Sequence, residues 1–334
     1  MSTRFAINGL GRIGRALLRI ACHRAELHLV AINELASPDQ LARLVARDSV
    51  HGSFDLPVDA GPGELRVGEH RIRVTHVEEP AQIPWPGGEP LVVVDATGTL
   101  ETREDAAAHL REAVSHVVVS ANLDDADLTV CLGVNDEAFD PRRDRVVSNA
   151  SCTTNCMAPV ARVLDRAFGL ERGLLTTIHS YTRGQELLDG AQSDPRRSRA
   201  AATNLVPAAT GAARAVALVM PELAGRLDAQ AVRVPVPDGS MVQFVVRLRT
   251  GPSLAEVADA FRQAAAGPLA GILAVTDEQL VSSDFLGDPH SAIVDLPLLQ
   301  CLEGDLYRVV AWYDNEWGYA TRLADLVMRI GERR

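Results

Sequence analysis

Cys152 is the residue whose type and setting most directly suggest chemistry. It stands among small hydroxyl and amide residues in the segment Ser148-Asn149-Ala150-Ser151-Cys152-Thr153-Thr154-Asn155-Cys156. The valines at 146 and 147 read as the end of a strand, and residues 157–168 read as an amphipathic helix. A thiol at the start of a helix feels the positive end of the helix dipole, which favours the nucleophilic thiolate. We therefore expect Cys152 to act in covalent catalysis.

His179 is a candidate base for this thiol, because it lies near the end of a predicted strand over 173–180. The pattern alone does not single it out among the other histidines. A thiolate and a histidine, together with the dinucleotide cofactor that the glycine segment Gly9-Leu10-Gly11-Arg12-Ile13-Gly14 predicts, suit aldehyde oxidation. Cys152 would attack the aldehyde, and His179 would take the hydroxyl proton as hydride leaves, giving a thioester. Backbone N–H groups at the helix start would stabilise the oxyanion, and a bound phosphate could release an acyl phosphate.

Other readings of the cysteines need to be weighed. A cysteine among small residues is often a buried apolar residue. Cys152 and Cys156 are one helical turn apart, but no further ligands have metal-site spacing, so no metal is expected and Cys156 is interpreted as structural. The chain has five scattered cysteines, an odd number that favours reduced thiols over a disulfide framework.

The first half of the chain has the pattern of a dinucleotide-binding unit. A short strand over 4–8 runs into Gly9-Leu10-Gly11-Arg12-Ile13-Gly14, then a helix to about residue 24 and a strand over 27–33. Gly9 permits the tight turn, Gly11 lets backbone approach a pyrophosphate, and Gly14 lets the helix pack closely. Glu34 after the second strand can bind the ribose hydroxyls and would repel a 2′-phosphate, which favours NAD over NADP.

Further strands alternate with helices in this half. Strands over 91–95 and 117–120 flank a helix over 103–112, and the segment 53–90 reads as hairpins and loops at a sheet edge. Such alternation implies a parallel sheet with ligands beyond the carboxyl ends of its strands. Thr97 and Ser120 are therefore candidate cofactor neighbours, although hydroxyls also cap ordinary turns.

The second half reads as a different kind of domain. Strands over 173–180, 231–235, 241–248 and 306–313 have few helices between them, which predicts a mainly antiparallel sheet with helices on one face. An irregular basic loop over 181–204 is of the kind that is usually functional. Arg183, Arg196, Arg197, Arg199, Arg214 and Arg233 form a local basic group suited to phosphate. Thr210-Gly211 before a helix is a second possible anion site. The alternatives are a solvated loop or a subunit contact.

The bulk properties set limits on partners and compartment. The 334 residues are enough for two domains, and 47% hydrophobic residues support a sizeable core. A net charge of −11 argues against nucleic acid as the main partner. No apolar run has the length of a membrane span, and the start of the chain lacks the features of a signal peptide. We expect a cytoplasmic protein without a membrane partner.

Together these residues closely resemble the phosphorylating glyceraldehyde-3-phosphate dehydrogenase family along nearly the whole chain. The resemblance rests on the glycine segment 7–15, the segment 148–156, and the motifs Thr176-Thr177-Ile178-His179-Ser180-Tyr181-Thr182, Arg196-Arg197-Ser198-Arg199-Ala200-Ala201, Thr210-Gly211-Ala212-Ala213, Arg233-Val234-Pro235 and Trp312-Tyr313-Asp314-Asn315-Glu316-Trp317-Gly318. It implies a Rossmann-type domain over 1–151 and 316–334, to which the last helix returns. It also implies an α+β catalytic domain over 152–315.

The resemblance also implies roles for individual residues. Cys152 would be the nucleophile and His179 its base. Two anion sites follow: one for attacking inorganic phosphate, at Ser151, Thr153, Thr210, Gly211 and Arg233, and one for the substrate's phosphate, at Thr182, Arg197 and Arg233. The NAD contacts would be Asn8, Gly9, Gly11, Arg12, Ile13, Glu34, Thr97, Ser120 and Asn315, with Asn315 on the nicotinamide carboxamide. The family is a homotetramer that acts in glycolysis and gluconeogenesis on a small phosphorylated aldehyde.

The chain departs from the family pattern at several positions, namely Glu34, Glu78, 122–125, Arg183-Gly184 and Gln243. The sister enzyme erythrose-4-phosphate dehydrogenase, which forms a free acid by hydrolysis in pyridoxal phosphate biosynthesis, is the main alternative. Segments 33–35 and 288–295 look more like that enzyme, whereas Thr182 and Thr210-Gly211-Ala212-Ala213 look more like the phosphorylating enzyme. A non-catalytic NAD-binding paralogue is a further alternative, against which Cys152, His179 and Arg233 argue.

Overall fold

The computed structural model describes residues 2–111 and 113–333, and it divides into two compact units. Unit 1 comprises residues 1–130, 136–150 and 319–334, and unit 2 comprises residues 131–135 and 151–318. The sequence predicted boundaries after residues 151 and 315. It gave no sign that the short segment 131–135 groups with the second unit. We describe each unit by itself.

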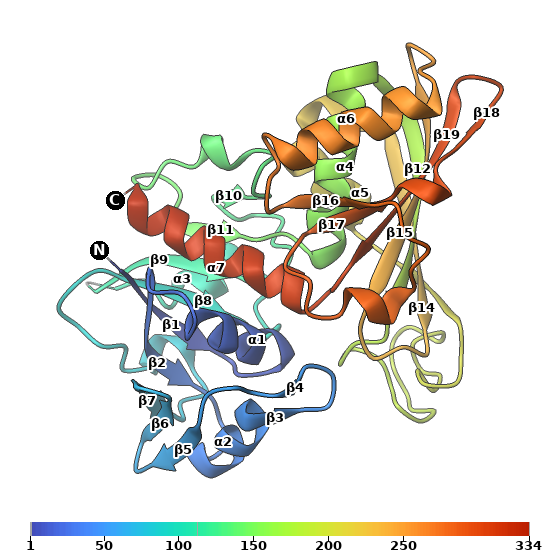
Figure 1. The fold of residues 1–334 in the computed structure, drawn as a ribbon. Coiled ribbons are helices and arrows are strands. Elements are labelled where there is room, and N and C mark those ends of the chain that lie inside the picture. Colours follow the sequence, from blue (N-terminus) through green and yellow to red (C-terminus); the bar gives the residue numbers. More distant parts are fainter. Residues whose placement is uncertain (1, 112, 334) are drawn as a thin grey trace. The chain divides into compact units, whose positions relative to one another are not determined.

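Unit 1 contains a largely parallel sheet (Figure 1). Nine strands of its described residues are ordered β10-β11-β9-β8-β1-β2-β7-β6-β5. Their bounds are β1 Thr3–Asn8, β2 Leu27–Asn33, β5 Val58–Gly61, β6 Glu64–Val67, β7 His70–Thr75, β8 Leu91–Asp95, β9 Val114–Val119, β10 Leu128–Thr129 and β11 Val146–Ser148. Pairs from β10 to β7 are parallel, whereas β5, β6 and β7 form antiparallel hairpins at one edge. The predicted parallel sheet with hairpins at its edge is confirmed.

The helices of unit 1 connect these strands. They are α1 Arg12–Ala21, α2 Pro38–Ala46, α3 Arg103–Ala107 and most of α7 Trp317–Glu332, with 3-10 turns at Pro80–Gln82 and Asp136–Ala138 and a small hairpin of β3 Arg47–Asp48 and β4 Gly52–Ser53. The predicted helix over 103–112 is too long: α3 ends at Ala107, and Glu112 lies outside the described residues. Beyond Ala107 the chain turns inward, because His109 is fully buried and bonds to Asp95 and Trp85.

Unit 2 is built on a mainly antiparallel sheet. Its described strands are ordered β13-β14-β12-β15-β19-β17-β16, with β18 paired to β19. Their bounds are β12 Leu170–Ser180, β13 Val206–Ala209, β14 Leu227–Val234, β15 Ser240–Leu248, β16 Leu273–Thr276, β17 Ala292–Asp295, β18 Gln300–Leu302 and β19 Leu306–Tyr313. The exceptions to antiparallel pairing are β12 with β14 and β16 with β17. This confirms the predicted fold class.

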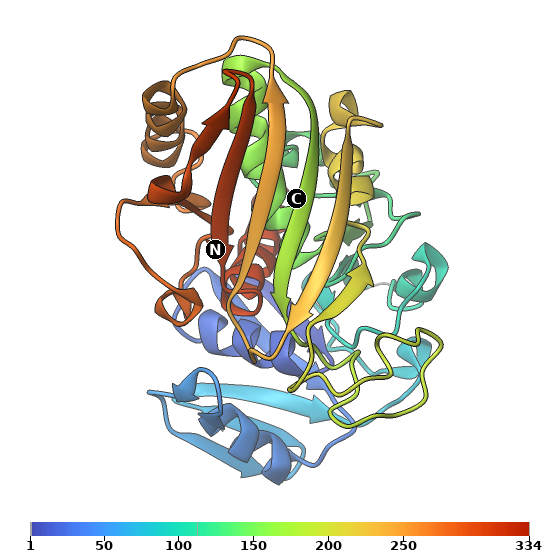
Figure 2. The same cartoon turned by 90° about the vertical axis from the view of Figure 1, so that its right-hand side faces the viewer.

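Helices cover one face of this sheet. They are α4 Cys152–Phe168, α5 Ala212–Val219 and α6 Leu254–Ala266, with 3-10 turns at Pro221–Leu223, Ser282–Phe285 and Leu296–Leu298. Side chains such as Met157, Val160 and Leu164 of α4 join Phe244 and Val246 of the sheet in one buried core. In Figure 2 the long strands run side by side in front of α4, and no described helix of unit 2 lies on the near face.

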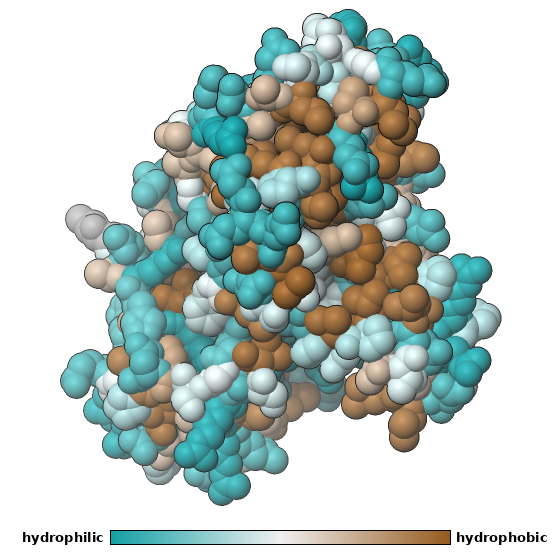
Figure 3. Space-filling model, turned by 45° about the vertical axis from the view of Figure 1, so that its right-hand side comes forward, coloured by the Kyte–Doolittle hydropathy of each residue, from teal (hydrophilic) through white to brown (hydrophobic). Residues whose placement is uncertain are grey.

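The near face of the sheet carries apolar side chains that are not fully covered. Leu174 is 66% exposed, and Ile178, Val232, Met241 and Val245 are partly exposed beside it on neighbouring strands. Figure 3 shows hydrophobic side chains at the surface in the upper part of the view, which unit 2 forms. None of the described helices is long and apolar enough to cross a membrane.

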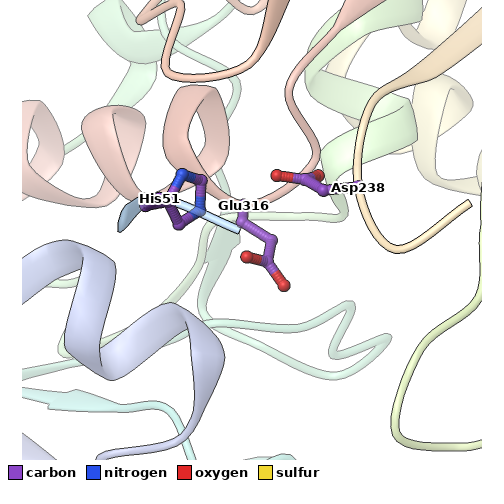
Figure 4. Close-up of side chains that lie close together, drawn as sticks. All are labelled: His51, Asp238 and Glu316. Carbon is purple, nitrogen blue, oxygen red and sulfur yellow. The ribbon is translucent and has the colours of Figure 1, made fainter. Parts of the chain in front are cut away.

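A group of acidic side chains lies where β19 passes into α7. Asp314 accepts hydrogen bonds from the backbone N–H groups of Glu316 and Trp317, which caps the helix start. Figure 4 labels Asp238 and Glu316, which are 2% and 8% exposed, together with His51 of unit 1. Burial, followed by the negative charges of Asp314 and Glu316, raises the pKa of Asp238 to about 9. Asp238 is therefore protonated at neutral pH.

We predict that Asp238→Asn stabilises the protein increasingly as pH rises from 5 to 8. The folded-state pKa of Asp238 lies above the unfolded value of 3.8, so wild-type stability is lost as pH rises between the two values. Asparagine mimics the protonated acid and removes this loss. Thermal unfolding at several pH values measures the difference in Tm between variant and wild type.

The matched control is Asp228→Asn, which changes an exposed aspartate on β14 and should leave the pH profile of Tm unchanged. A constant difference in Tm between Asp238→Asn and wild type over this pH range would show that Asp238 is ionised in the folded protein.

Candidate active site

Cys152 is the first residue of α4. Ser151 is the N-cap residue, and its Oγ accepts a hydrogen bond from the backbone N–H of Thr154 at 3.1 Å. The thiol is partly buried, whereas Cys156 one turn later is fully buried in the core of unit 2. The burial of Cys156 agrees with its interpretation as a structural residue, and none of the five cysteines is paired in a disulfide.

His179 lies against the thiol. It is next to the last residue of β12, is 3% exposed, and places Nε2 3.3 Å from Cys152 Sγ. Parallel pairing of β12 with β14 sets His179 opposite Arg233, whose Nη1 lies 2.6 Å from His179 Nδ1. The structure therefore brings together three residues that the sequence analysis placed on separate elements.

The two contacts of His179 Nδ1 correspond to different tautomers. Nδ1 also lies 2.8 Å from the backbone oxygen of Ser180, which only accepts, whereas a guanidinium only donates. A proton on Nδ1 bonds to Ser180 and leaves Nε2 free to take the thiol proton. A proton on Nε2 leaves Nδ1 to accept from Arg233 and points an N–H group at the sulfur, which suits a thiolate. The site can thus stabilise both states of Cys152.

Burial and charge act in opposite directions on the thiol. Burial raises the pKa of Cys152, and the positive charge of Arg233 followed by hydrogen bonding from Thr153 opposes that rise. The sequence analysis treated the helix dipole and a buried apolar cysteine as alternatives, whereas the structure combines a helix start with burial. Burial, and next the charge of Arg233, lower the pKa of His179 to about 3, so the imidazole is neutral at physiological pH and able to accept a proton.

The residues matched to phosphate sites stand at the ends of other elements of unit 2. Thr210 Oγ1 accepts a hydrogen bond from the Ala212 N–H at the start of α5, where Gly211 is the N-cap. The charge of Arg197 contributes to lowering the pKa of Arg233, which indicates that the two guanidiniums repel each other. An anion between two such cations would relieve this repulsion. Thr182 is exposed just beyond β12.

Two residues that are predicted to bind phosphate, Ser151 and Thr153, also form hydrogen bonds within the protein. Ser151 Oγ caps α4 and lies 2.8 Å from Thr154 Oγ1. Thr153 Oγ1 lies 3.0 Å from the hydroxyl of Tyr313, which lies 3.0 Å from Thr177 Oγ1. The ring of Tyr313 also packs edge-on against His179. The sequence analysis did not single out Tyr313, although its place in the motif 312–318 was a usable signal.

Asn315 lies two residues beyond β19 and is 6% exposed. Its Oδ1 accepts hydrogen bonds from the hydroxyls of Ser180 and Ser240 at 2.9 and 2.6 Å. Neither serine was predicted as a site residue. Their only sequence signal was position, since Ser180 follows His179 directly and Ser240 opens β15.

The glycine turn of unit 1 fits a pyrophosphate. Gly9 has φ of +89°, and a Cβ at Gly14 would approach the Gly9 oxygen to 2.2 Å, so both positions require glycine. A Cβ at Gly11, by contrast, would meet no atom within 4 Å. Gly11 therefore leaves open space at the start of α1, where a phosphate would find the positive end of the helix dipole. Ile13 lies in the first turn of the same helix.

Glu34 lies beside this turn. Its Oε2 accepts from the Leu10 N–H at 2.7 Å and its Oε1 from the Leu35 N–H at 2.8 Å. Each carboxylate oxygen can accept a further bond, so Glu34 can still bind ribose hydroxyls. The Arg12 guanidinium pairs with Asp48, and contact between Arg12 and a cofactor would therefore come most directly from its backbone.

The remaining predicted cofactor contacts lie at the carboxyl ends of parallel strands. Asn8 is 5% exposed, donates to Asp95 at 2.7 Å and accepts from Asn33 at 2.8 Å, so its side chain ties β1 to β8 and β2. Thr97 Oγ1 donates to Asp95 Oδ1 at 2.6 Å. Ser120 follows β9, and its backbone N–H donates to the backbone oxygen of Asp95. Asn8 thus has a structural task in unit 1, while Thr97 and Ser120 border the same edge.

Comparison with known proteins also assigns the two parts of the chain to two different domains. Two family models match: the NAD binding domain of glyceraldehyde 3-phosphate dehydrogenase over residues 3–103, and its C-terminal domain over residues 151–315. The chain is 46% identical to glyceraldehyde-3-phosphate dehydrogenase 2 of Streptomyces arenae, covering 99% of both chains. It is 47% identical to glyceraldehyde-3-phosphate dehydrogenase 1 of Bacillus cereus, covering 97% of both.

The matches cover the residues of unit 2 around Cys152 and those of the glycine turn in unit 1. Because both family models match and relatives are similar over nearly the full length, the chain belongs to the glyceraldehyde-3-phosphate dehydrogenase family and is an NAD-dependent oxidoreductase.

Proposed function

We propose that this chain oxidises glyceraldehyde 3-phosphate to 1,3-bisphosphoglycerate with NAD and inorganic phosphate, as a step of glycolysis. The observation that carries the proposal is the 3.3 Å approach of His179 Nε2 to Cys152 Sγ, with Arg233 beside the other ring nitrogen. A neutral imidazole in contact with a thiol at a helix start is an arrangement suited to forming and breaking a covalent intermediate.

The chemistry follows from these groups. His179 takes the thiol proton as sulfur bonds to the aldehyde carbon and passes it to the carbonyl oxygen, giving a neutral thiohemiacetal and a neutral imidazole. Backbone N–H groups at the start of α4 stabilise the charge that develops on that oxygen. His179 next takes the hydroxyl proton while the carbon loses hydride, which leaves a thioester on Cys152. When bound, NAD supplies the hydride acceptor. A phosphate oxygen then attacks the thioester carbon, the C–S bond breaks, and the thiolate returns.

The choice of phosphate rather than water as acyl acceptor rests on the residues of unit 2. Thr210 and Gly211 at the start of α5, and the guanidiniums of Arg197 and Arg233, offer donors and charge for more than one anion. Relatives at 46–47% identity are named glyceraldehyde-3-phosphate dehydrogenases, which supports the three-carbon substrate over erythrose 4-phosphate.

We further propose a homotetramer in the cytoplasm, where a reducing environment keeps Cys152 a free thiol. The near face of the unit 2 sheet supports self-association, because Leu174 and the partly exposed Ile178, Met241 and Val245 leave apolar side chains uncovered there. A two-fold axis through that face would pack the surface of one copy against the same surface of another.

We predict that steady NADH formation from glyceraldehyde 3-phosphate requires inorganic phosphate. Without phosphate the thioester cannot be released, so the yield should stop at about one NADH per Cys152. Thr210→Val should raise the KM for phosphate about tenfold, because it removes a hydroxyl at the start of α5. Stopped-flow absorbance measures both the burst and the steady rate, and Cys152→Ser should abolish both. Phosphate-independent turnover that prefers erythrose 4-phosphate would instead favour the hydrolytic enzyme.

We also predict that Arg233→Gln shifts the pH dependence of Cys152 alkylation to higher pH. The positive charge of Arg233 lowers the pKa of the thiol, so its loss leaves less thiolate at any given pH. The rate of reaction with iodoacetamide between pH 7 and 11, followed by mass spectrometry of the Cys152 peptide, gives the midpoint. Arg247→Gln, which removes an exposed arginine of β15, is the control. An unshifted midpoint in Arg233→Gln would show that its charge does not act on the sulfur.

The role of the near face of the unit 2 sheet in self-association can be tested at Leu174. Leu174→Glu should reduce the sedimentation coefficient of the protein, because a carboxylate on the near face opposes self-association. Leu302→Glu is the matched control, since Leu302 is 65% exposed, as against 66% for Leu174, but lies on the short strand β18. Circular dichroism checks that both variants fold. Equal sedimentation of Leu174→Glu and wild type would exclude this face as the interface.

A further inference from the structure

The side-chain amide of Asn315 is held by two buried hydroxyls. Ser180 and Ser240 are 0% and 1% exposed, and both donate to Asn315 Oδ1. We propose that Ser180 and Ser240 are positioning residues that fix the Asn315 amide in one orientation, with Nδ2 turned outward to donate to the nicotinamide carboxamide. The proposal rests on the part of the proposed function in which Asn315 contacts the cofactor.

Counting hydrogen atoms explains why the amide has one preferred orientation. Each serine hydroxyl has a single proton, and in the observed arrangement both protons are used on Asn315 Oδ1. Ser240 Oγ also accepts a hydrogen bond from the Ser180 backbone N–H at 3.1 Å. The hydroxyl proton of Ser240 therefore still needs an acceptor, and Asn315 Oδ1 is that acceptor. A flipped amide would turn Nδ2 toward both hydroxyls and take away the acceptor of two buried protons. Losing buried hydrogen bonds in this way is unfavourable, so the flipped state is disfavoured.

The main chain on either side of this amide is also fixed. Asp314 accepts from the backbone N–H groups of Glu316 and Trp317, and its other oxygen accepts from the Gly287 N–H at 2.7 Å. The backbone of Asn315 therefore has little freedom, and rotation of its amide is the main degree of freedom left. The two serines remove that freedom.

Ser180 also connects this amide to the catalytic base. Its backbone oxygen lies 2.8 Å from His179 Nδ1 and accepts from Arg233 Nη1 at 3.1 Å, while its hydroxyl bonds to Asn315. One residue thus orients the imidazole through its main chain and the amide through its side chain. Substituting the hydroxyl alone should affect the cofactor side and leave the contacts of the base in place.

The test measures binding of NAD to the full-length protein by calorimetry. Ser240→Ala and Ser180→Ala should each weaken NAD binding about fivefold, because the amide then samples the flipped orientation. Asn315→Ala should weaken it at least as much. Adding Ser240→Ala to Asn315→Ala should cause no further loss, since the serine acts only through the amide. Ser240→Thr keeps the hydroxyl and should stay within about twofold of wild type.

ADP-ribose, which lacks the nicotinamide, provides a second measurement. All these variants should bind ADP-ribose like wild type and should keep the wild-type rate of Cys152 alkylation at pH 7, and circular dichroism checks that they fold. If both serine variants bind NAD with normal affinity while Asn315→Ala binds it weakly, the positioning role is overturned and the proposed function stands. Normal NAD affinity in Asn315→Ala would overturn the Asn315 contact itself. A loss of ADP-ribose binding as large as the loss of NAD binding would overturn the proposal in favour of a general structural role.

Discussion

The contact between Arg233 and His179 is the interaction on which the rest of unit 2 depends. Burying a guanidinium is costly, and burial accordingly lowers the pKa of Arg233. The buried charge lies beside Nδ1 of the base, and it is close enough to the sulfur to oppose the rise in the pKa of Cys152. Parallel register between β12 and β14 produces this contact, because it sets the two residues opposite each other. The antiparallel strands around them serve to hold that register.

The sequence predicted the fold and much of the site because both rest on local patterns. The glycine turn could be assigned because each glycine has its own predicted requirement, and the structure bears out the steric ones at Gly9 and Gly14. Strand limits near Glu34 and His179 were also predictable, since apolar runs end there. Cys152 was recognisable from its place between a strand and a helix.

The remaining features depend on contacts between distant segments, which a single sequence does not reveal. The early end of α3 depends on His109 reaching Asp95 and Trp85. The rise in the pKa of Asp238 depends first on its burial and next on two acids near the start of α7, which follow it by many residues in the chain. The two serines around Asn315 come from the ends of two strands, β12 and β15, and nothing in their local sequence distinguishes them from ordinary turn residues.

The parallel pairing of β12 with β14 has a consequence for how the reactive centre appears during synthesis. A growing chain that has reached α5 already contains Cys152 and His179, but it does not yet contain Arg233. Until β14 is added beside β12, the sulfur lacks the Arg233 guanidinium, whose charge opposes the rise that burial causes in the pKa of Cys152. The thiol, its base and the guanidinium come together only when this pair of strands is complete, so a chain that ends before β14 cannot form the reactive centre.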